Sequence, residues 1–232
     1  ITYGNIVYQK AKERLATEAN DFKRFKTIEI SGPERLPPIF SKQFKTILDL
    51  PRVAGYGIWR PVILFEKLKK VKDNEYLLYL DAGCKLNKKG MNKFNEYIEK
   101  LDKSGYGIMS IQMTGNNGPG SFEMEKWWTT KEIFNYFKVD INSDIANTGQ
   151  YLDGILLMKK NKHLIKIIEL WLDAVLKNPL MFTDIYNNKQ YKFFKSNRHE
   201  QSVFSLIRKI HGSYVIDGDE SWMHPFGKGE SL

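Results

Sequence analysis

The sequence predicts a single α/β domain with a central, mostly parallel sheet flanked by helices. Two runs, residues 76–80 and 151–158, are almost wholly apolar, which is typical of strands covered on both faces inside such a sheet. Strand-like and helix-like patterns alternate along the chain, as they do around parallel sheets. With 232 residues and no internal repeat, low-complexity segment or linker, the chain fits one domain with ample core.

The first half of the chain reveals its elements through local signals. Residues 1–4 resemble the end of a strand that breaks at Gly4-Asn5, and residues 6–21 carry a helical apolar stripe. Pro61 stands at a favourable first-turn position for a helix that runs to Val71. The other expected elements are a short strand at 27–30, a short helix at 41–50, the strand at 76–80, and a helix at 88–103 capped by Asn87.

The second half continues the alternation. Thr129 to Glu132 resembles a helix N-cap followed by a carboxylate in the first turn, so a helix is expected from there to Phe137. Residues 162–176 form a strongly amphipathic helical pattern that Pro179 ends. The other expected elements are a strand at 106–113, a glycine- and asparagine-rich loop at 114–120, the strand at 151–158, a helix at 197–210, a strand at 213–216 and a polar tail.

The net charge of +9 suits an anionic ligand, an anionic membrane surface or nucleic acid, and a lysine-rich proteome produces the same composition. The lysines are scattered as on a solvated face and no nucleic-acid-binding motif is present, so no nucleic-acid partner is expected. The single cysteine, Cys84, excludes an intrachain disulfide and fits a reducing compartment. No segment has the length of an apolar membrane span. We expect a cytoplasmic protein whose positive surface suits loose attachment to the inner face of a membrane.

Asp81 is the first candidate site residue. It directly follows the apolar strand at 76–80, and ligands of open α/β sheets collect beyond the carboxyl ends of the strands. Ala82 and Gly83 are small and leave room for a metal or a phosphorylated ligand to approach. The alternative is an Asx turn that only terminates the strand.

The residues around Asp81 resemble a known family. Asp81-Ala82-Gly83 resembles the Asp-x-Asp element of glycosyltransferases with the GT-A fold, with Gly83 in place of the second Asp. The segment from Gly55 through Pro61 to Cys84 is similar to a group of bacterial and viral nucleotide-diphospho-sugar transferases. Arg198 to Ser202 resembles a later His-Asp-Gln-Ser stretch of the same bacterial and viral group. Asn147-Thr148-Gly149 and His224 to Lys228 resemble the Asn-x-Gly and His-x-x-Gly-x-Lys motifs of the glycogenin and lipopolysaccharide galactosyltransferase families.

The resemblance implies a single GT-A (Rossmann-like) domain over residues 1–232. Residues 1–113 would be its nucleotide-binding half, and residues 114–232 its acceptor-side half with a C-terminal lid. The implied activity is transfer of a hexose from a nucleotide-diphosphate sugar, with UDP as the expected nucleotide, to a hydroxyl of a glycan or glycolipid acceptor. The acceptor would belong to a surface polysaccharide or a viral glycoprotein.

The resemblance also implies residues that hold the donor. Thr2, Tyr3 and Gly4 end the first strand, where GT-A folds hold the nucleotide base, and either Tyr3 or Tyr8 is placed to stack on it. Arg60 is implied to contact the phosphate or sugar, with a surface arginine beside a packed tryptophan as the alternative. The other implied donor-binding residues are Asp81, Ala82, Gly83, Arg198 and Lys228.

A divalent ion, Mn²⁺ or Mg²⁺, is the expected cofactor because the donor leaves as a diphosphate whose charge must be stabilised. The implied ligands are Asp81 and His224. Gly83 offers no side-chain ligand and Cys84 is too soft for hard divalent ions. Metal binding is therefore expected to be weak, or to be replaced by cationic side chains such as Arg60, Arg198 and Lys228.

Three residues are candidates for the chemistry itself. Asp153 lies in an apolar strand, where a carboxylate is costly unless paired or functional, so it is expected to contact the donor sugar or the acceptor. Gln150 lies beside that strand. Glu200 is a candidate general base, or alternatively a carboxylate placed at a helix start by the helix dipole. Retention and inversion of the anomeric configuration both stay open.

Two other hypotheses compete with the enzyme. The missing second Asp at Gly83 motivates a non-catalytic nucleotide-sugar-binding module of a larger protein. The positive charge motivates a nucleic-acid-binding protein. The pair Trp127-Trp128 has two interpretations. The two rings stack on an acceptor sugar, or they pack in the core, which is the more common place for tryptophan.

Overall fold

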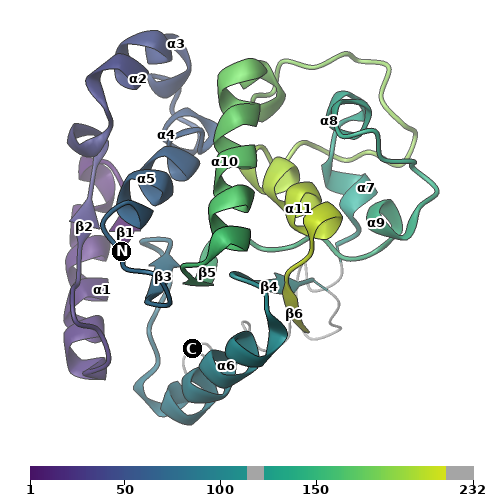
Figure 1. The fold of residues 1–232 in the computed structure, drawn as a ribbon. Coiled ribbons are helices and arrows are strands. Elements are labelled where there is room, and N and C mark those ends of the chain that lie inside the picture. Colours follow the sequence, from purple (N-terminus) through teal and green to yellow (C-terminus); the bar gives the residue numbers. More distant parts are fainter. Residues whose placement is uncertain (114–122, 218–232) are drawn as a thin grey trace.

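A twisted sheet runs through the centre of the molecule (Figure 1). The computed structural model describes residues 1–113 and 123–217. The strands of these residues are β1 (Thr2–Tyr3), β2 (Ile30–Ser31), β3 (Tyr76–Leu80), β4 (Met109–Gln112), β5 (Ile155–Lys159) and β6 (Tyr214–Asp217). The predicted α/β class is confirmed.

Backbone pairing gives the strand order β2-β1-β3-β5-β4-β6. β1 pairs with β2 and β4 pairs with β6, both in parallel. The Ile1 amino group donates to Leu78 O at 2.9 Å and Leu80 N donates to Ile1 O at 3.2 Å, a pattern that sets β1 parallel to β3. β5 is antiparallel both to β3, with Leu80 opposite Ile155, and to β4. The sheet is mostly parallel as predicted, and β5 begins at the edge where β3 ends.

Helices cover both faces of this sheet, with α5, α10 and α11 on one side and α6 on the other (Figure 1). The long helices are α1 (Gln9–Phe22), α5 (Trp59–Leu68), α6 (Met91–Ser104), α10 (Lys162–Lys177) and α11 (Glu200–His211). The short ones are η1 (Ile6–Tyr8), η2 (Pro33–Arg35), α2 (Pro38–Gln43), α3 (Lys45–Leu48), α4 (Val53–Tyr56), η3 (Lys88–Gly90), α7 (Glu125–Trp128), α8 (Lys131–Tyr136), α9 (Asp144–Asn147) and η4 (Pro179–Phe182). None of the helices in these ranges has the length and apolar character needed to cross a bilayer.

Alternating side chains of β3 divide the core into two layers. Leu77 and Tyr79 pack into the upper core with α5, α10 and α11, whereas Leu78 and Leu80 pack into the lower core with α1 and α6. This alternation follows from the two-residue period of a strand and explains why the run is apolar throughout. In the upper core the fully buried ring of Trp171 stacks on Phe204 at 3.7 Å, which joins α10 to α11.

Several expected boundaries differ from those observed. Pro38 starts a helix at its first turn, so the helix expected at 41–50 is instead the pair α2 and α3. The strand expected at 151–158 begins only at Ile155, because Asp153 turns into a buried ionic cluster instead of the ladder. The helix expected at 197–210 begins at Glu200.

A left-handed turn precedes α5. Val53, Ala54, Gly55, Tyr56 and Gly57 have φ values of 49°, 48°, 90°, 57° and 73°. Left-handed backbone costs roughly 1–2 kcal/mol for each residue with a side chain. A Cβ at Gly55 would lie 2.6 Å from Leu48 Cα, so glycine is needed there for space as well. Such strain is retained where the surrounding structure fixes it, and this turn leads straight into Arg60.

Candidate functional site

Arg60, the second residue of α5, lies at the centre of three carboxylates and is almost completely buried. Its Nη2 lies 2.9 Å from Asp81 Oδ1 and 3.5 Å from Glu200 Oε1. Its Nη1 lies 2.5 Å from Asp153 Oδ2. We call Arg60, Asp81, Asp153 and Glu200 the carboxylate–arginine cluster.

The fold brings these residues together from distant parts of the chain. Asp81 directly follows β3, and Asp153 stands two residues before β5. Because β5 is antiparallel to β3, the start of one meets the end of the other, and Asp81 N donates to Gly154 O at 2.8 Å. Glu200 is the first residue of α11. Packing of α11 in the upper core brings this residue to the same edge of the sheet, where β3 ends and β5 begins.

The left-handed turn at residues 53–57 packs against the start of α11. The Tyr56 ring lies 4.8 Å from the ring of His199, whose own φ of 56° is also left-handed. His199 Nε2 lies 2.9 Å from Asp184 Oδ1. A side chain at Gly57 would overlap the Glu200 carboxyl group, so this glycine leaves the space that Glu200 fills. The strained turn therefore fixes the position of Glu200 as well as that of Arg60.

The three carboxylates differ in exposure. The side chain of Asp81 is 41% exposed, whereas those of Asp153 and Glu200 are 7% and 6% exposed. Asp81 Oδ1 also accepts a hydrogen bond of 2.5 Å from the Tyr79 hydroxyl. A Cβ on Gly83 would meet nothing within 4 Å, so the space beside Asp81 is open. Asp81 is thus the member of the cluster that a ligand can reach.

Burial and mutual charge shift the pKa values in the cluster. Burial raises the pKa of Asp153, and the nearby Arg60 charge only partly opposes this. Burial and the Asp153 charge raise the pKa of Glu200 well above its usual value. Burial by itself would lower the pKa of Arg60, but Asp153 and Asp81 raise it well above the usual value. The two buried carboxyl groups therefore bind a proton more readily than ordinary carboxyl groups, while Arg60 stays charged.

Two atoms of the cluster lack an aligned hydrogen-bond partner, whereas Arg60 Nη2 donates a hydrogen bond to Asp81 Oδ1. Asp153 Oδ2 and Arg60 Nε are buried without an aligned hydrogen-bond partner, although Oδ2 lies 2.5 Å from Arg60 Nη1. A buried polar atom left without such a partner costs about 1–3 kcal/mol. Such atoms cluster where function, not stability, has selected the residue types.

The structure places Arg60 and Gln150 in the interior. Arg60 is expected to contact a phosphate or sugar, and the structure shows its buried guanidinium in contact with carboxylates. Gln150 is fully buried; its Nε2 donates to Glu125 Oε1 at 2.9 Å and its Oε1 accepts from Gln201 Nε2 at 2.6 Å. This places Gln150 in a packing contact between α7 and α11, without an exposed atom for a substrate.

The residues of the first strand are also buried. The Tyr3 ring stacks on Trp59 at 3.9 Å, so the core occupies the face that stacking on a base requires. Thr2 is buried beside it, whereas Tyr8 on η1 is half exposed. Gly4 O accepts a hydrogen bond of 2.7 Å from Lys12 Nζ.

Lys12 is a buried lysine at the ends of β1 and β2 that the sequence does not reveal. It is buried, and its Nζ also donates to Ser31 O at 3.0 Å. It therefore places a positive charge at the carboxyl ends of β1 and β2. A lysine on an amphipathic helix usually points to solvent, and only its spacing of eight residues from Gly4 hints otherwise.

Arg198 lies outside the direct contacts of the cluster. Its guanidinium lies 4.0 Å from the centre of the Trp128 ring, and its Nη2 lies 3.7 Å from Glu123 Oε1. Trp128 is half-buried and donates through Nε1 to Glu123 at 2.6 Å. Ala82 is buried, and its carbonyl accepts from Arg14 Nη2 at 3.1 Å.

The predicted metal site is only partly within the described residues. His224 and Lys228 lie outside them. Within residues 1–113 and 123–217, no group of three histidine, cysteine, aspartate or glutamate side chains is arranged to hold a metal ion. Asp81 provides one exposed carboxylate, whose Oδ1 is already bound by Arg60 and Tyr79. The Asp81 carboxylate is a hard oxygen ligand of the kind that a divalent ion prefers, but it is the single ligand that the described residues supply.

Comparison with solved structures gives one informative likeness. The fold is similar to that in the crystal structure of a glycosyltransferase involved in the glycosylation of the major capsid of PBCV-1, with a TM-score of 0.50 and 11% sequence identity. The match covers 93% of this chain and 78% of that chain. Neither protein-family models nor curated protein sequences match the chain. The likeness establishes that this α/β chain has the overall fold seen in that glycosyltransferase.

Proposed function

We propose that the protein is a glycosyltransferase that moves a hexose from a nucleotide-diphosphate sugar, with UDP as the nucleotide, to a hydroxyl of a glycan or glycolipid. The observation that carries the proposal is the position of Asp81. It is an exposed carboxylate at the carboxyl end of β3, held from behind by Arg60 at 2.9 Å and Tyr79 at 2.5 Å. The fold likeness over most of the chain supports the same activity.

In this proposal Asp81 faces the diphosphate end of the donor. A free carboxylate repels a diphosphate, so a cation has to lie between them. Asp81 Oδ2 accepts no hydrogen bond from the described residues and would be the protein ligand of Mn²⁺ or Mg²⁺, together with His224. When bound, such an ion stabilises the negative charge that develops on the leaving diphosphate. Arg198 and Lys228 are proposed as the protein's further cations toward the phosphates.

Arg60 has a positioning role in this scheme. Its two Nη atoms contact Asp81 and Asp153, so that Asp81 would meet the donor in a set orientation. Lys12 gives the edge of β1 and β2 a positive charge, which suits the nucleotide side of the donor. In the proposed division, residues 1–113 bind the nucleotide and residues 114–232 bind the acceptor.

Glu200 is the proposed general base. Burial and the Asp153 charge raise the pKa of Glu200, so its carboxylate is a stronger base than an ordinary one. A base of this kind acts in inverting transfer, so NMR of the product anomer tests the role directly. Retained configuration would assign Glu200 to positioning alone.

Donor hydrolysis tests the proposal. The protein is incubated with UDP-hexoses and Mn²⁺ and the released UDP is measured, with Asp81→Asn as the variant. Asp73→Asn is the matched control, since Asp73 is a highly exposed aspartate whose side chain forms a salt bridge with Lys160. UDP release that Asp81→Asn abolishes and Asp73→Asn leaves intact supports the enzyme.

The second candidate is a non-catalytic nucleotide-sugar-binding module within a larger protein. It is favoured by Gly83, which provides no second carboxylate, and by the absence of a complete metal-ligand group among the described residues. Saturable binding of UDP-sugars without UDP release, with or without acceptor sugars, supports this module. If no nucleotide sugar binds, both candidates are wrong.

A further inference from the structure

A cavity of about 690 Å³ lies between α1, α6 and the lower face of β3. It contains none of the four residues of the carboxylate–arginine cluster. Its volume falls within the range of roughly 300–1,000 Å³ that is usual for small-molecule sites. Thr2 is the one implied donor-binding residue in its lining, and Asp81, Arg60 and Arg198 lie outside it.

The interior of the cavity is apolar. Its walls include Leu15 and Ala19 from α1, Leu78 and Leu80 from β3, and Phe94 from α6. These residues belong to the lower core, yet Leu78 and Leu80 keep 8% and 7% exposure because the cavity reaches them. Ala16 and Ala19 are short, so α1 does not fill the space in front of β3.

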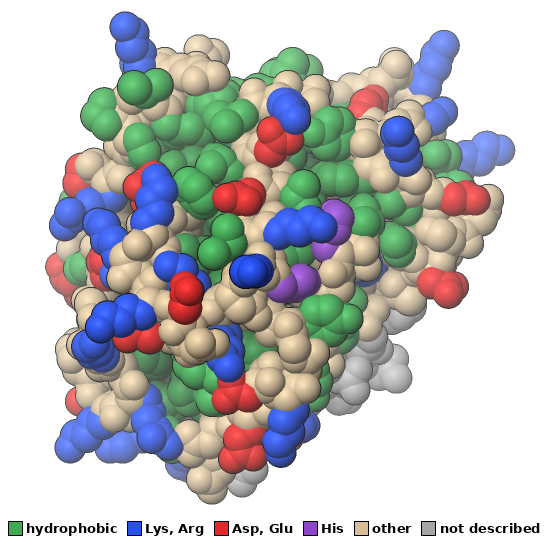
Figure 2. All heavy atoms as spheres, in the orientation of Figure 1, with side chains coloured by type: hydrophobic (Ala, Val, Ile, Leu, Met, Phe, Trp, Pro, Cys, Tyr) green, Lys and Arg blue, Asp and Glu red, His purple; other side chains and the backbone are tan. Residues whose placement is uncertain are grey.

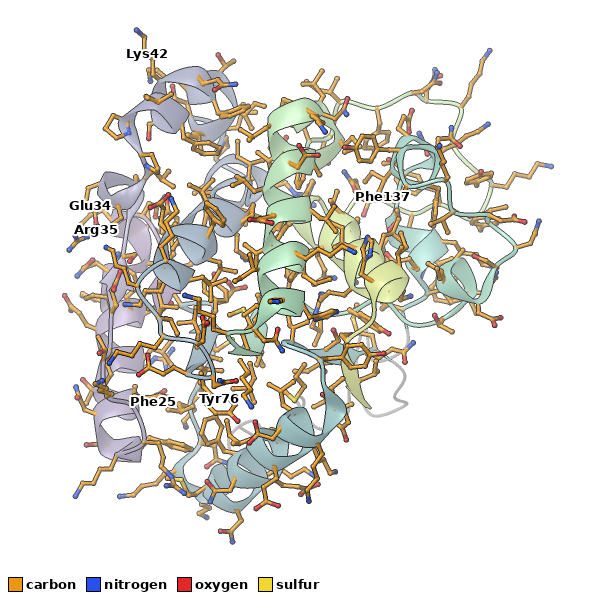
Figure 3. The ribbon with its side chains drawn as sticks, viewed as in Figure 1. Phe25, Glu34, Arg35, Lys42, Tyr76 and Phe137 are labelled. Carbon is orange, nitrogen blue, oxygen red and sulfur yellow. The ribbon has the colours of Figure 1, made fainter. Side chains whose placement is uncertain are left out.

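The mouth of the cavity is positively charged. Five cationic side chains and two carboxylates belong to its lining: Arg24, Lys26, Lys67, Lys70, Lys72, Glu29 and Glu75. Figure 3 shows Phe25 and Tyr76 on the two sides of this region, beside α1 and beside β3. Figure 2 shows basic side chains gathered over the same left-hand part of the molecule, with hydrophobic atoms between them.

Only part of this charge is neutralised within the protein. Lys67 lies 2.6 Å from Glu29, and Lys26 lies 3.8 Å from Glu75. Arg24 donates to the neutral Asn95 side chain. The Lys70 and Lys72 side chains are exposed and make no salt bridge with the described residues, although the Glu75 carboxylate lies close enough to Lys72 for their charges to attract. The mouth therefore retains positive charge for an anionic group.

We propose that this cavity binds a single-chain anionic amphiphile, an acyl chain with a carboxylate or phosphate head group. The chain lies under β3 among Leu15, Leu78 and Phe94, and the head group lies at Lys70 and Lys72. A nucleobase is a poorer occupant, because its hydrogen-bonding groups would lack partners wherever leucine, alanine and phenylalanine side chains form the wall. A hydrocarbon chain carries no such groups, and the charge of the mouth complements the head group.

Calorimetric titration of the whole chain tests the proposal with three probes. Dodecanoate has the proposed chemistry, dodecyltrimethylammonium has the same chain with the opposite charge, and inorganic phosphate has the charge without the chain. The expected result is saturable binding of dodecanoate, weaker binding of the cationic probe, and no measurable binding of phosphate. A failure of dodecanoate to saturate the protein overturns the proposal.

Two variants locate the site. In Lys70→Glu/Lys72→Glu we expect dodecanoate affinity to fall by roughly tenfold or more and the preference to reverse toward the cationic probe. Lys42→Glu/Lys189→Glu is the control with the same charge change on two other exposed lysines, and it should leave the preference unchanged. Ala19→Trp fills the cavity and should abolish binding, with circular dichroism to verify folding. Equal dodecanoate affinity in both charge variants contradicts the proposed head-group position and overturns the proposal.

Vesicle sedimentation separates the two sources of such an amphiphile. Binding to phosphatidylglycerol vesicles, but not to phosphatidylcholine vesicles, that is lost in Lys70→Glu/Lys72→Glu identifies a membrane lipid as the source. Binding of dodecanoate without binding to vesicles identifies a free amphiphile. Both outcomes support the cavity as an acyl-chain site.

Discussion

Arg60 Nη2 lies 2.9 Å from Asp81 Oδ1 and joins the start of α5 to the carboxyl end of β3. Arg60 is buried while Asp81 is half exposed, so the protein holds a ligand-facing carboxylate with a cation that solvent does not reach. The same guanidinium also contacts the carboxyl groups of Asp153 and Glu200 behind it. This contact therefore links the stability of the fold to the geometry of the proposed donor site.

Removing the Arg60 charge is expected to destabilise the protein strongly. Arg60→Met leaves three carboxylates without their common cation, and breaking a buried ion pair costs about 3–5 kcal/mol. Arg60→Lys keeps the charge but not the two-pronged geometry, so an intermediate loss is expected. Urea unfolding measures both. Lys45→Gln, which breaks the exposed pair with Asp49, should change the unfolding free energy by less than about 1 kcal/mol.

Glu200 is expected to make stability fall as pH rises. Its pKa is raised in the folded state, so the folded protein binds more protons than the unfolded chain between the unfolded and folded pKa values. The stabilisation is complete below the unfolded pKa of about 4.3 and is lost as pH rises toward the folded pKa. Glu200→Gln lacks this proton uptake, so its unfolding free energy relative to wild type should increase from pH 5 to pH 8. Parallel pH profiles of the two proteins would show that Glu200 does not titrate in this way.

Asp81→Asn is expected to lower UDP release by about 100-fold or more, the effect usually seen when one stabilising contact to a developing charge is removed. The loss of stability should be smaller than in Arg60→Met, because the Asp81 side chain is 41% exposed. Steady-state UDP release and urea unfolding of the same samples separate the two effects. Unchanged turnover in Asp81→Asn removes the residue from the proposed site.

Gly83→Asp is expected to strengthen metal binding. The open space around Gly83 accepts a side chain, so the unfolding free energy should change by no more than about 1 kcal/mol. The added carboxylate stands two residues from Asp81 and supplies a second hard oxygen ligand. Mn²⁺ should therefore raise the melting temperature more in the variant than in wild type. Gly105→Asp adds the same group at another glycine with open space; its φ of 74° should lower the stability of this variant, but the metal should give no extra response.

Ala54→Gly is expected to stabilise the protein. Ala54 has φ 48° and ψ 56° in the left-handed turn, and glycine relieves a strain of roughly 1 kcal/mol there. Ala174→Gly in the right-handed helix α10 should instead destabilise by about 1 kcal/mol. Urea unfolding measures both variants. If the two midpoints shift in the same direction from the wild-type midpoint, the assignment of a left-handed turn is contradicted.

The sequence by itself determines the features that depend on residues adjacent in the chain, namely where helices and strands lie and where they end. The apolar run at 76–80 predicts a doubly covered strand, and β3 is buried on both faces as a result. The helical pattern at 162–176 and the proline at 179 predict α10 almost to the residue. Asp81 is predicted at a strand end because a strand boundary is a local property, and it is found there.

Only the tertiary structure decides which side chains meet. Arg60, Asp153 and Glu200 are far apart in sequence, and their contact depends on the antiparallel placement of β5 and on the packing of α11. Buried Gln150 and Lys12 depend equally on which face of an element the core covers. Local patterns carry propensity and periodicity, whereas burial, pairing and the cavity below β3 arise from contacts between distant segments, and no short stretch of the chain encodes those by itself.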